Sequence, residues 1–277
     1  MSLSPINSGQ LQKIIKVIYE NSGYDFSNYS KASFGRRLEK IIKDHRLKGH
    51  RELIEKLSGD LSFFANVLPD LTVSTTEMFR DPEVYKGIFD QLLPELATYP
   101  SIRIWHAGCS TGEEVYSMTI LLKEFGLYDR CSIYATDIDE RALATAKRGI
   151  YRLDDLQEYT KRYYKVGGTT PFSEYYNSSD KFFSFDASLR KNVLFSTHNL
   201  AIDKSFGDFH LIICRNVMIY FDRILQERVL GLFKNSLMRR GLLVLGSKES
   251  IGFTSEEKNF ETIDHKLRFF KRIGGPL

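Results

Sequence analysis

The stretch Trp105–Ser117, WHAGCSTGEEVYS, combines a glycine turn with two adjacent glutamates. Apolar residues at strand spacing precede it and an apolar run follows it, which is typical of a strand, a tight turn and a helix. Turns of this kind hold nucleotides in α/β sheets. The N–H groups that begin a helix attract phosphate, but Glu113 and Glu114 would repel a pyrophosphate there. The turn therefore favours a ligand that carries hydroxyl groups and positive charge.

A further acid, Asp137, ends an apolar strand in the segment YATDID. Open α/β sheets place an acid at this position against ribose hydroxyls. The alternative is that Asp137 caps the helix that follows. A dinucleotide-dependent oxidoreductase would also carry G-x-G-x-x-G, whereas this turn supplies only Gly108 and Gly112. The motif therefore disfavours a dinucleotide.

Composition sets broad limits on the protein class. The chain has 277 residues, of which 42% are hydrophobic, enough for one large or two small domains with a substantial core. Its three cysteines lack metal-ligand or paired spacing, so we expect reduced thiols in a cytoplasm and no metal site. Neither a signal peptide nor a membrane span is expected. The net charge of +4 permits an acidic partner without requiring nucleic acid.

The apolar pattern changes near residue 70. Before it, apolar residues recur at helical spacing; after Arg103, strands alternate with helices, which predicts an α/β fold with a parallel sheet. Residues 151–190 break this alternation and predict an inserted β-rich subdomain, while FETIDHKLRFFKRI near the end predicts edge strands. The expected helical stripes are Leu11, Ile14, Ile15 and Ile18; Phe34, Leu38, Ile41, Ile42 and His45; and Leu53, Ile54 and Leu57.

Four motifs in order give the chain a resemblance to a known family: LTVSTTEMFRD, WHAGCSTGEEVYS, ATDIDERALATAKRGIY and CRNVMIYFD. Together they resemble the CheR family of S-adenosylmethionine-dependent methyltransferases that act on bacterial chemotaxis receptors. The similarity extends from about Leu11 to Ile273. It implies an all-α N-terminal domain at residues 1–70 and a Rossmann-like methyltransferase domain with a small β-subdomain at residues 71–277. The implied reaction is methyl transfer to glutamates on the receptor's cytoplasmic helical bundle.

The resemblance also implies a cofactor site. S-adenosylmethionine carries a sulfonium, an ammonium, a carboxylate and a ribose but no phosphate, so Glu114 can attract its cationic part. Asp137 would accept the ribose hydroxyls, and Asn199 and Leu200 would form the adenine edge unless Asn199 only ends a strand. The residues that the resemblance assigns to cofactor binding are Ser74, Thr76, Arg80, Ala107, Gly108, Glu114, Asp137, Asn199, Leu200, Arg215 and Asn216.

Arg215, Asn216 and Tyr220 interrupt an apolar run, and burying them without partners would cost free energy, so we expect them to line the site. The alternative for Arg215 is a core arginine paired with an acid such as Asp222. Methylases of nucleic-acid amines typically carry Asn/Asp-Pro-Pro-aromatic here. The sequence Asn-Val-Met-Ile argues against such an enzyme.

The LTVSTTEMFRD motif both matches and departs from the family. Thr76 and Arg80 match, but Ser74 stands where the family has asparagine, and it lacks the reach of an amide. The guanidinium of Arg80 can hold a carboxylate through two parallel hydrogen bonds, either on the cofactor or on the incoming glutamate. The alternative for Arg80 is a surface ion pair with Asp81 or Glu83.

A glutamate carboxylate is ionised at neutral pH, so methyl transfer to it requires alignment and no general base. We expect Arg80 and Tyr220 to be the catalytic residues and to act by positioning. Two other functions stay open: methylation of a different acidic protein, and a non-catalytic cofactor-binding signalling module. We further expect a monomer that associates with membrane-bound receptor arrays without inserting into the bilayer.

The second predicted helix offers a basic face. If its apolar residues are buried, Arg36, Lys40 and Lys43 lie together on the opposite side. One interpretation is an ordinary solvated surface. The other is a docking surface for an acidic receptor bundle.

Overall fold

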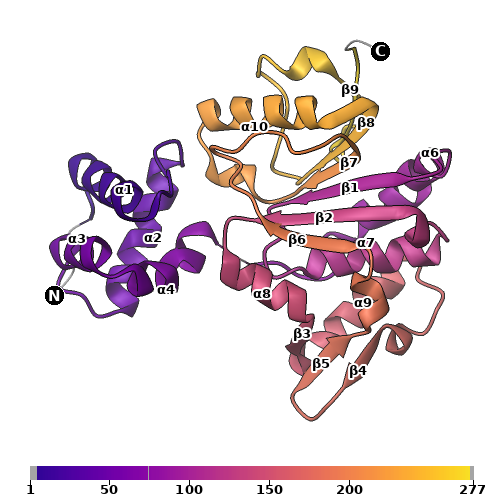
Figure 1. Cartoon of the computed structure of the whole chain (residues 1–277), viewed down its shortest axis with the longest axis horizontal. Helices are drawn as coiled ribbons and strands as arrows, with labels where there is room; N and C mark the ends of the chain where they lie inside the picture. The colour runs from indigo at the N-terminus through magenta and orange to yellow at the C-terminus, as the bar shows by residue number, and fades with distance from the viewer. Residues whose placement is uncertain (1–4, 74, 275–277) are drawn as a thin grey trace. The chain divides into compact units, whose positions relative to one another are not determined.

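The chain folds into two compact units, drawn in Figure 1. The computed structural model describes residues 5–73 and 75–274. The first unit comprises the residues up to 74 together with 218–229, and the second comprises 75–217 and the residues from 230 onwards. Ser74, one of the predicted cofactor-binding residues, lies outside the described residues.

The first unit is helical because its apolar residues recur at helical spacing. The helix α1 (Ser8–Ser22) begins at a capping box formed by Asn7 and Gln10 and buries the predicted stripe. The remaining helices up to residue 73 are α2 (Lys31–Asp44), α3 (His50–Gly59) and α4 (Leu61–Thr72).

Three residues differ from the expected stripes. Ile54 is only half-buried, while Leu53 and Leu57 of its stripe are buried. His45 is exposed, because it lies at the end of α2 as its C-cap residue. Arg37, by contrast, is only 8% exposed and shares the buried face of α2 with Phe34 and Leu38. The helix α4 was not predicted; Asp60 caps its start by accepting a hydrogen bond from the backbone N–H of Phe63.

The second unit is built on a seven-stranded sheet, as the α/β prediction requires. The strand order is β6-β2-β1-β7-β8-β10-β9, in which the first five strands are parallel and β10 is antiparallel to both its neighbours. The Rossmann-like prediction is therefore confirmed. The strands are β1 (Ile102–Ala107), β2 (Cys131–Asp137), β6 (Val193–Thr197), β7 (Phe209–Cys214), β8 (Leu237–Leu245), β9 (Phe260–Asp264) and β10 (Phe269–Arg272).

The prediction that the last two strands lie at the edge is correct only for β9. The strand β10 lies between β8 and β9, and it buries Phe269 and Phe270. Helices cover the sheet, and α7 and α8 follow β1 and β2 as predicted. Among the helices of this unit are α5 (Pro82–Gly87), a π-helical turn (Ile88–Leu92), α6 (Leu93–Leu96), α7 (Glu113–Glu124) and α8 (Glu140–Arg148). The helix α10 (Arg223–Ser236) begins in the first unit and ends in the second.

A small antiparallel sheet, β3-β5-β4, is inserted between α8 and β6 together with α9 (Figure 1). Glu124 at the end of α7 anchors it by accepting hydrogen bonds from the hydroxyl groups of Tyr163, Thr169 and Tyr175. Burial alone would raise the pKa of Glu124, but these bonds outweigh it and lower the pKa to about 2. The elements are β3 (Ile150–Arg152), α9 (Leu156–Val166), β4 (Tyr176–Ser178) and β5 (Phe182–Phe185).

Across the described residues, no helix combines the length and apolar character that crossing a bilayer requires.

Candidate active site

The candidate site begins with the turn after β1. Gly108 and Gly112 adopt φ angles of 78° and 96°, which favour glycine. The N–H groups of Gly108 and Cys109 donate to the carbonyl of Thr136 on β2, at 2.8 and 2.9 Å. A Cβ at Gly108 would lie 2.5 Å from a methyl group of Val217, which follows β7. Glycine thus lets the segments after β1 and β7 approach each other at the carboxyl ends of their strands.

Asp137 lies beside this turn and is only 8% exposed. Its carboxylate accepts hydrogen bonds from the backbone N–H groups of Ser110, at 2.7 Å, and Asp139, at 2.9 Å. Burial raises its pKa, against the effect of these bonds. The helix α8 is capped by Asp139 and not by Asp137, so the capping alternative is wrong. Each oxygen of Asp137 keeps acceptor capacity for a hydroxyl group.

Glu114 is the centre of a buried charged cluster. One of its oxygens lies 3.2 Å from Nδ1 of His106 on β1, and the other accepts a hydrogen bond from Arg215 at 3.2 Å. Burial alone would raise the pKa of Glu114, but the hydrogen bond from His106 and the charge of Arg215 outweigh it and lower the pKa. The side chain is 15% exposed, so an ionised carboxylate stays within reach of a ligand.

Arg215 links this cluster to the loop that carries Arg80. Its guanidinium is 2% exposed, lies 2.7 Å from the carboxylate of Asp81 and donates to the carbonyl of Arg80 at 3.1 Å. The predicted alternative partner, Asp222, is wrong: its carboxylate accepts the backbone N–H of Leu225 at the start of α10. The arginine is therefore paired with two acids that the sequence placed in other motifs.

Arg80 itself has no hydrogen-bonded or ionic side-chain partner among the residues that the structure describes, and it is half-buried. The alternative of an ion pair with Asp81 or Glu83 is not observed. Phe79 and Asp81, on either side of it, both adopt left-handed φ angles, 48° and 58°. Ser117 accepts a hydrogen bond from the N–H of Phe79, and Arg215 binds Asp81. The strained loop thus fixes the backbone at Arg80 and leaves its guanidinium available.

The turn after β7 is held by Glu249, to which the sequence analysis gave no role. This buried carboxylate accepts hydrogen bonds from the N–H groups of Asn216, Val217 and Gly246, at 3.1, 2.8 and 2.6 Å. Asn216 has a φ of 62°, and its backbone is stabilised in that conformation by these bonds. The role of its side chain toward a cofactor stays a prediction.

The other predicted cofactor contacts end β1, follow β6 or precede α5. Ala107 and Leu200 are buried, and Thr76 is half-buried. The side chain of Asn199 accepts a hydrogen bond from the N–H of Ala201, at 2.9 Å, which forms a turn of the kind the alternative required.

Tyr220 belongs to the first unit. Its ring lies under the guanidinium of Arg37, 4.4 Å from the centroid, and its carbonyl accepts the N–H of Ser30 at 2.8 Å. Arg37 also donates to the carbonyl of Leu71 and to the hydroxyl of Ser33. These contacts hold Tyr220 against α2.

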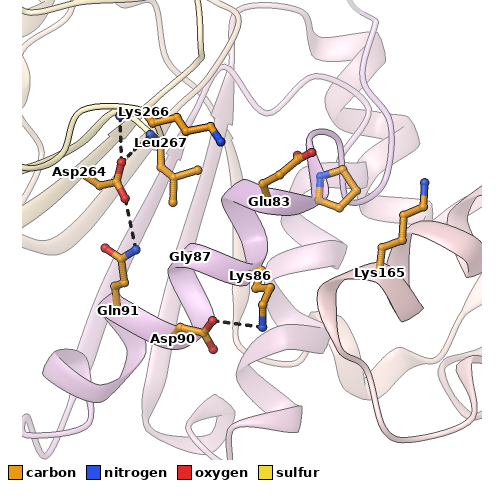
Figure 2. A pocket seen from close by; sticks show the side chains of 10 residues that line it. Glu83, Lys86, Gly87, Asp90, Gln91, Lys165, Asp264, Lys266 and Leu267 are labelled. Carbon is orange, nitrogen blue, oxygen red and sulfur yellow. Dashed lines mark hydrogen bonds and ion pairs between the residues drawn. The ribbon is translucent and has the colours of Figure 1, made fainter.

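A pocket of about 450 Å³ lies elsewhere in the second unit. Figure 2 shows that its lining comes from α5, the π-helical turn, α9 and the turn between β9 and β10. Three acids, Glu83, Asp90 and Asp264, balance three lysines, and none of the predicted cofactor-binding residues lines it. We assign this pocket no part in the site.

The cluster around the turn fits S-adenosylmethionine. Two carboxylates, those of Asp81 and Glu114, share the single guanidinium of Arg215, an arrangement that suits a cationic ligand. Asp137 offers acceptors for a ribose, and the buried hydroxyl of Ser110 has no hydrogen-bond partner among the described residues. The sequence analysis assigned no site role to His106, Asp81 or Glu249, because each of them acts by holding another residue of the site.

The mostly parallel sheet, with Asp137 at the end of β2 and Glu114 at the start of α7, is the architecture of a Rossmann-like methyltransferase. Residues 74–269 match the family model described as CheR methyltransferase, SAM binding domain, and residues 9–72 match that described as CheR methyltransferase, all-alpha domain. The chain therefore belongs to the CheR methyltransferase family, and S-adenosylmethionine is its cofactor.

Relatives with methyltransferase names match almost the whole chain. The chain is 44% identical to "Putative methyltransferase Cher3" of Pseudomonas putida, over 95% of this chain and 96% of that one. It is 32% identical to "Chemotaxis protein methyltransferase" of Borreliella burgdorferi, over 93% of each chain. The Salmonella typhimurium protein of the latter name is 30% identical over 88% of this chain and 85% of its own length.

Among solved structures, the N-methyltransferase NodS of Bradyrhizobium japonicum with S-adenosyl-L-homocysteine is 15% identical, with a TM-score of 0.34. The match covers 60% of this chain and 63% of that one. A similarity at this level carries no functional inference.

The neighbouring Glu113 gives a prediction about stability. It is 7% exposed and accepts a hydrogen bond from Thr111, and burial raises its pKa to about 7. The native state therefore binds this proton more tightly than the unfolded chain, so stability falls as pH rises from the unfolded value through about 7. We expect Glu113→Gln to stabilise the second unit at about pH 8, by on the order of 3 kcal/mol, and to have little effect near pH 5.

Chemical unfolding followed by the fluorescence of Trp105, the only tryptophan, would measure this difference. Glu124→Gln is the matched control. Its pKa of about 2 means that Glu124 is ionised at both pH values, so the variant should lose the same free energy at each. A pH-independent effect of Glu113→Gln would contradict the prediction.

Proposed function

We propose that the protein transfers the methyl group of S-adenosylmethionine to glutamate side chains of chemotaxis receptors, giving methyl esters and S-adenosylhomocysteine. The single observation that carries the proposal is the match of both family models, one to each part of the chain. The names of the relatives from Borreliella and Salmonella support a chemotaxis substrate. We propose residues 1–70 and 71–277 as the two domains.

Within this proposal the cofactor residues keep their predicted roles. Asp137 accepts the ribose hydroxyls and Glu114 binds the cationic part, with Arg215 and Asp81 completing the charged cluster. Thr76, Ala107, Gly108, Asn199, Leu200 and Asn216 are proposed contacts. When bound, S-adenosylmethionine supplies an electrophilic sulfonium methyl group.

The acceptor carboxylate forms the new bond to the methyl carbon as the carbon–sulfur bond breaks, and the sulfur keeps the electron pair. No proton moves in this step. Arg80, with no partner among the described side chains, is proposed to hold the acceptor carboxylate through two parallel hydrogen bonds. Tyr220 is proposed to align the reacting groups. The strained loop already restricts the backbone at Arg80, so less conformational entropy of this loop is lost when the reacting groups are aligned.

This mechanism predicts that the single-turnover rate is nearly constant between about pH 6 and 8.5, because a glutamate acceptor is ionised throughout. Glu113 titrates near the middle of this range, so the profile should also be measured in Glu113→Gln. An inflection that disappears in the variant belongs to Glu113. A rate that still rises with an apparent pKa near 7 in Glu113→Gln would indicate a general base and contradict the mechanism.

The basic face of α2 is proposed to dock the receptor. Arg36, Lys40 and Lys43 are exposed, but Lys40 lies 3.1 Å from Asp44 and 2.8 Å from Asp70, so part of its charge is already paired. Arg36 and Lys43 are the freer charges for an acidic helical bundle.

We expect Arg36→Glu/Lys43→Glu to raise the KM for a receptor fragment about tenfold or more at low salt, with cofactor affinity unchanged. Lys13→Glu/Lys16→Glu, which reverses two exposed lysines on α1, should leave the KM near the wild-type value. If Arg36→Glu/Lys43→Glu keeps the wild-type KM at low salt, the basic face of α2 does not dock the receptor and is an ordinary solvated surface.

The test of the proposed function compares receptor cytoplasmic fragments with other acidic proteins as acceptors of labelled methyl groups. We expect a label on the receptor fragment that mild alkali releases, as an ester requires. A label that resists alkali would indicate nitrogen methylation and overturn the proposal. Efficient labelling of an unrelated acidic protein would instead favour a broader acceptor range.

A further inference from the structure

His106 has one polar contact in the described structure, and that contact is Glu114. The imidazole is completely buried, its Nδ1 lies 3.2 Å from Glu114, and its Nε2 has no hydrogen-bond partner. Burying a polar ring with an unpaired nitrogen costs free energy, which an aliphatic side chain of similar size would avoid. The interaction with Glu114 is the compensation that the structure offers.

The direction of this hydrogen bond follows from the charge of the partner. The pKa of Glu114 is lowered, so its carboxylate is ionised at neutral pH and only accepts hydrogen bonds. Nδ1 of His106 must therefore carry the proton and donate it. With Arg215 on the other oxygen at 3.2 Å, the carboxylate is fixed from two sides, while its side chain keeps 15% exposure.

A carboxylate held in this way matches an ammonium group better than a sulfonium. An ammonium has N–H donors for the lone pairs that His106 and Arg215 leave free, whereas a sulfonium has none. Arg215 is itself shared with Asp81, so Glu114 keeps net negative character for a cation. The amino group of the cofactor's amino-acid part is the group of suitable chemistry.

We propose that His106 is a positioning residue that orients Glu114 toward the amino group of the cofactor. It thereby determines how much more tightly the protein binds ligands that carry the amino-acid part than ligands that lack it. This inference rests on the proposed role of Glu114. It concerns ligand binding alone and does not depend on the methyl acceptor.

The experiment compares the affinities of S-adenosylhomocysteine and 5′-methylthioadenosine by calorimetry. Both are uncharged at sulfur, and they differ in the amino-acid part, so their affinity ratio isolates its recognition. His106→Asn places an amide donor near the position of Nδ1, whereas His106→Gln places it near Nε2, out of reach of Glu114. We expect His106→Gln to lower the ratio about 10- to 100-fold, the range for a hydrogen bond to a charged group, and His106→Asn to keep it within about threefold.

Glu114→Gln separates this inference from its premise. If Glu114→Gln leaves the ratio unchanged, the proposed role of Glu114 is wrong and the inference falls with it. If Glu114→Gln lowers the ratio but His106→Gln does not, only the inference about His106 is overturned. Equal losses of affinity for both ligands in His106→Gln would also overturn the inference about His106. The same affinity ratio in His106→Asn and His106→Gln would do so too, because a residue that only fills space would affect both ligands alike and would not require an amide donor at Nδ1.

Discussion

Arg215→Met is expected to lower the free energy of unfolding of the second unit by about 3–5 kcal/mol, because it leaves Glu114 charged and buried without its cation. Arg215 is 2% exposed at its side chain, bridges Asp81 and Glu114 and also donates to the carbonyl of Arg80. The variant should also bind the cofactor poorly, since the loop before α5 loses its anchor. Denaturant unfolding and calorimetry would measure the two effects.

The double variant Arg215→Met/Glu114→Gln tests the cause. Removing the orphaned charge should recover part of the stability that Arg215→Met loses, so the two substitutions should not be additive. Asp81 has a side chain that is 43% exposed, and water can solvate it in either variant. An additive loss in the double variant would mean that Arg215 stabilises the unit through packing and backbone contacts instead of through Glu114.

Asp137→Ala is expected to weaken S-adenosylmethionine binding by about 1.5–3 kcal/mol, the range for hydrogen bonds to a charged group. Its carboxylate is the acceptor proposed for both ribose hydroxyls, and it also holds the N–H groups of Ser110 and Asp139. Some loss of stability should accompany the loss of affinity. NADH should not bind detectably to either protein.

Asp139→Ala provides the matched control, because Asp139 is a buried carboxylate two residues away that caps α8. Losing this cap should cost about 1 kcal/mol of stability and leave cofactor affinity near the wild-type value. If Asp137→Ala and Asp139→Ala each lose cofactor affinity in proportion to the stability that they lose, Asp137 acts by holding the turn and not by binding the ribose. Unchanged affinity in a folded Asp137→Ala protein would remove it from the site.

Local patterns predicted the parts of the fold whose partners are close in the sequence. The strand, turn and helix around Gly108 and Gly112 follow from apolar periodicity and turn chemistry within one short stretch. The helix α4 was missed; it contains Pro69, and an internal proline argues against a helix. The internal position of β10 depends on its antiparallel pairing with both β8 and β9, which no local pattern indicates.

The site shows the same limit. The proposed roles of Asp137 and Glu114 rest on local signals, because each residue stands at a strand end or helix start, where a carboxylate has a known use. The partners of Arg215 could not be predicted, since Glu114 is 101 residues away and Asp81 is 134 residues away. Arg37 stands among other charged residues in the sequence of α2, but it is buried against Tyr220 and the carbonyl of Leu71, both distant in the chain. Long-range pairing decides which charged residues are buried.

The most direct test of the central claim is to identify the atom that receives the methyl group. A receptor cytoplasmic fragment would be incubated with S-adenosylmethionine and the wild-type protein, digested, and mapped by mass spectrometry, with Asp137→Ala as the control of low cofactor affinity. We expect methyl esters on glutamate side chains, in yields that fall sharply with Asp137→Ala. Methyl groups on lysine, arginine or a chain terminus, or an unmodified receptor fragment with a cofactor-bound wild-type protein, would contradict it.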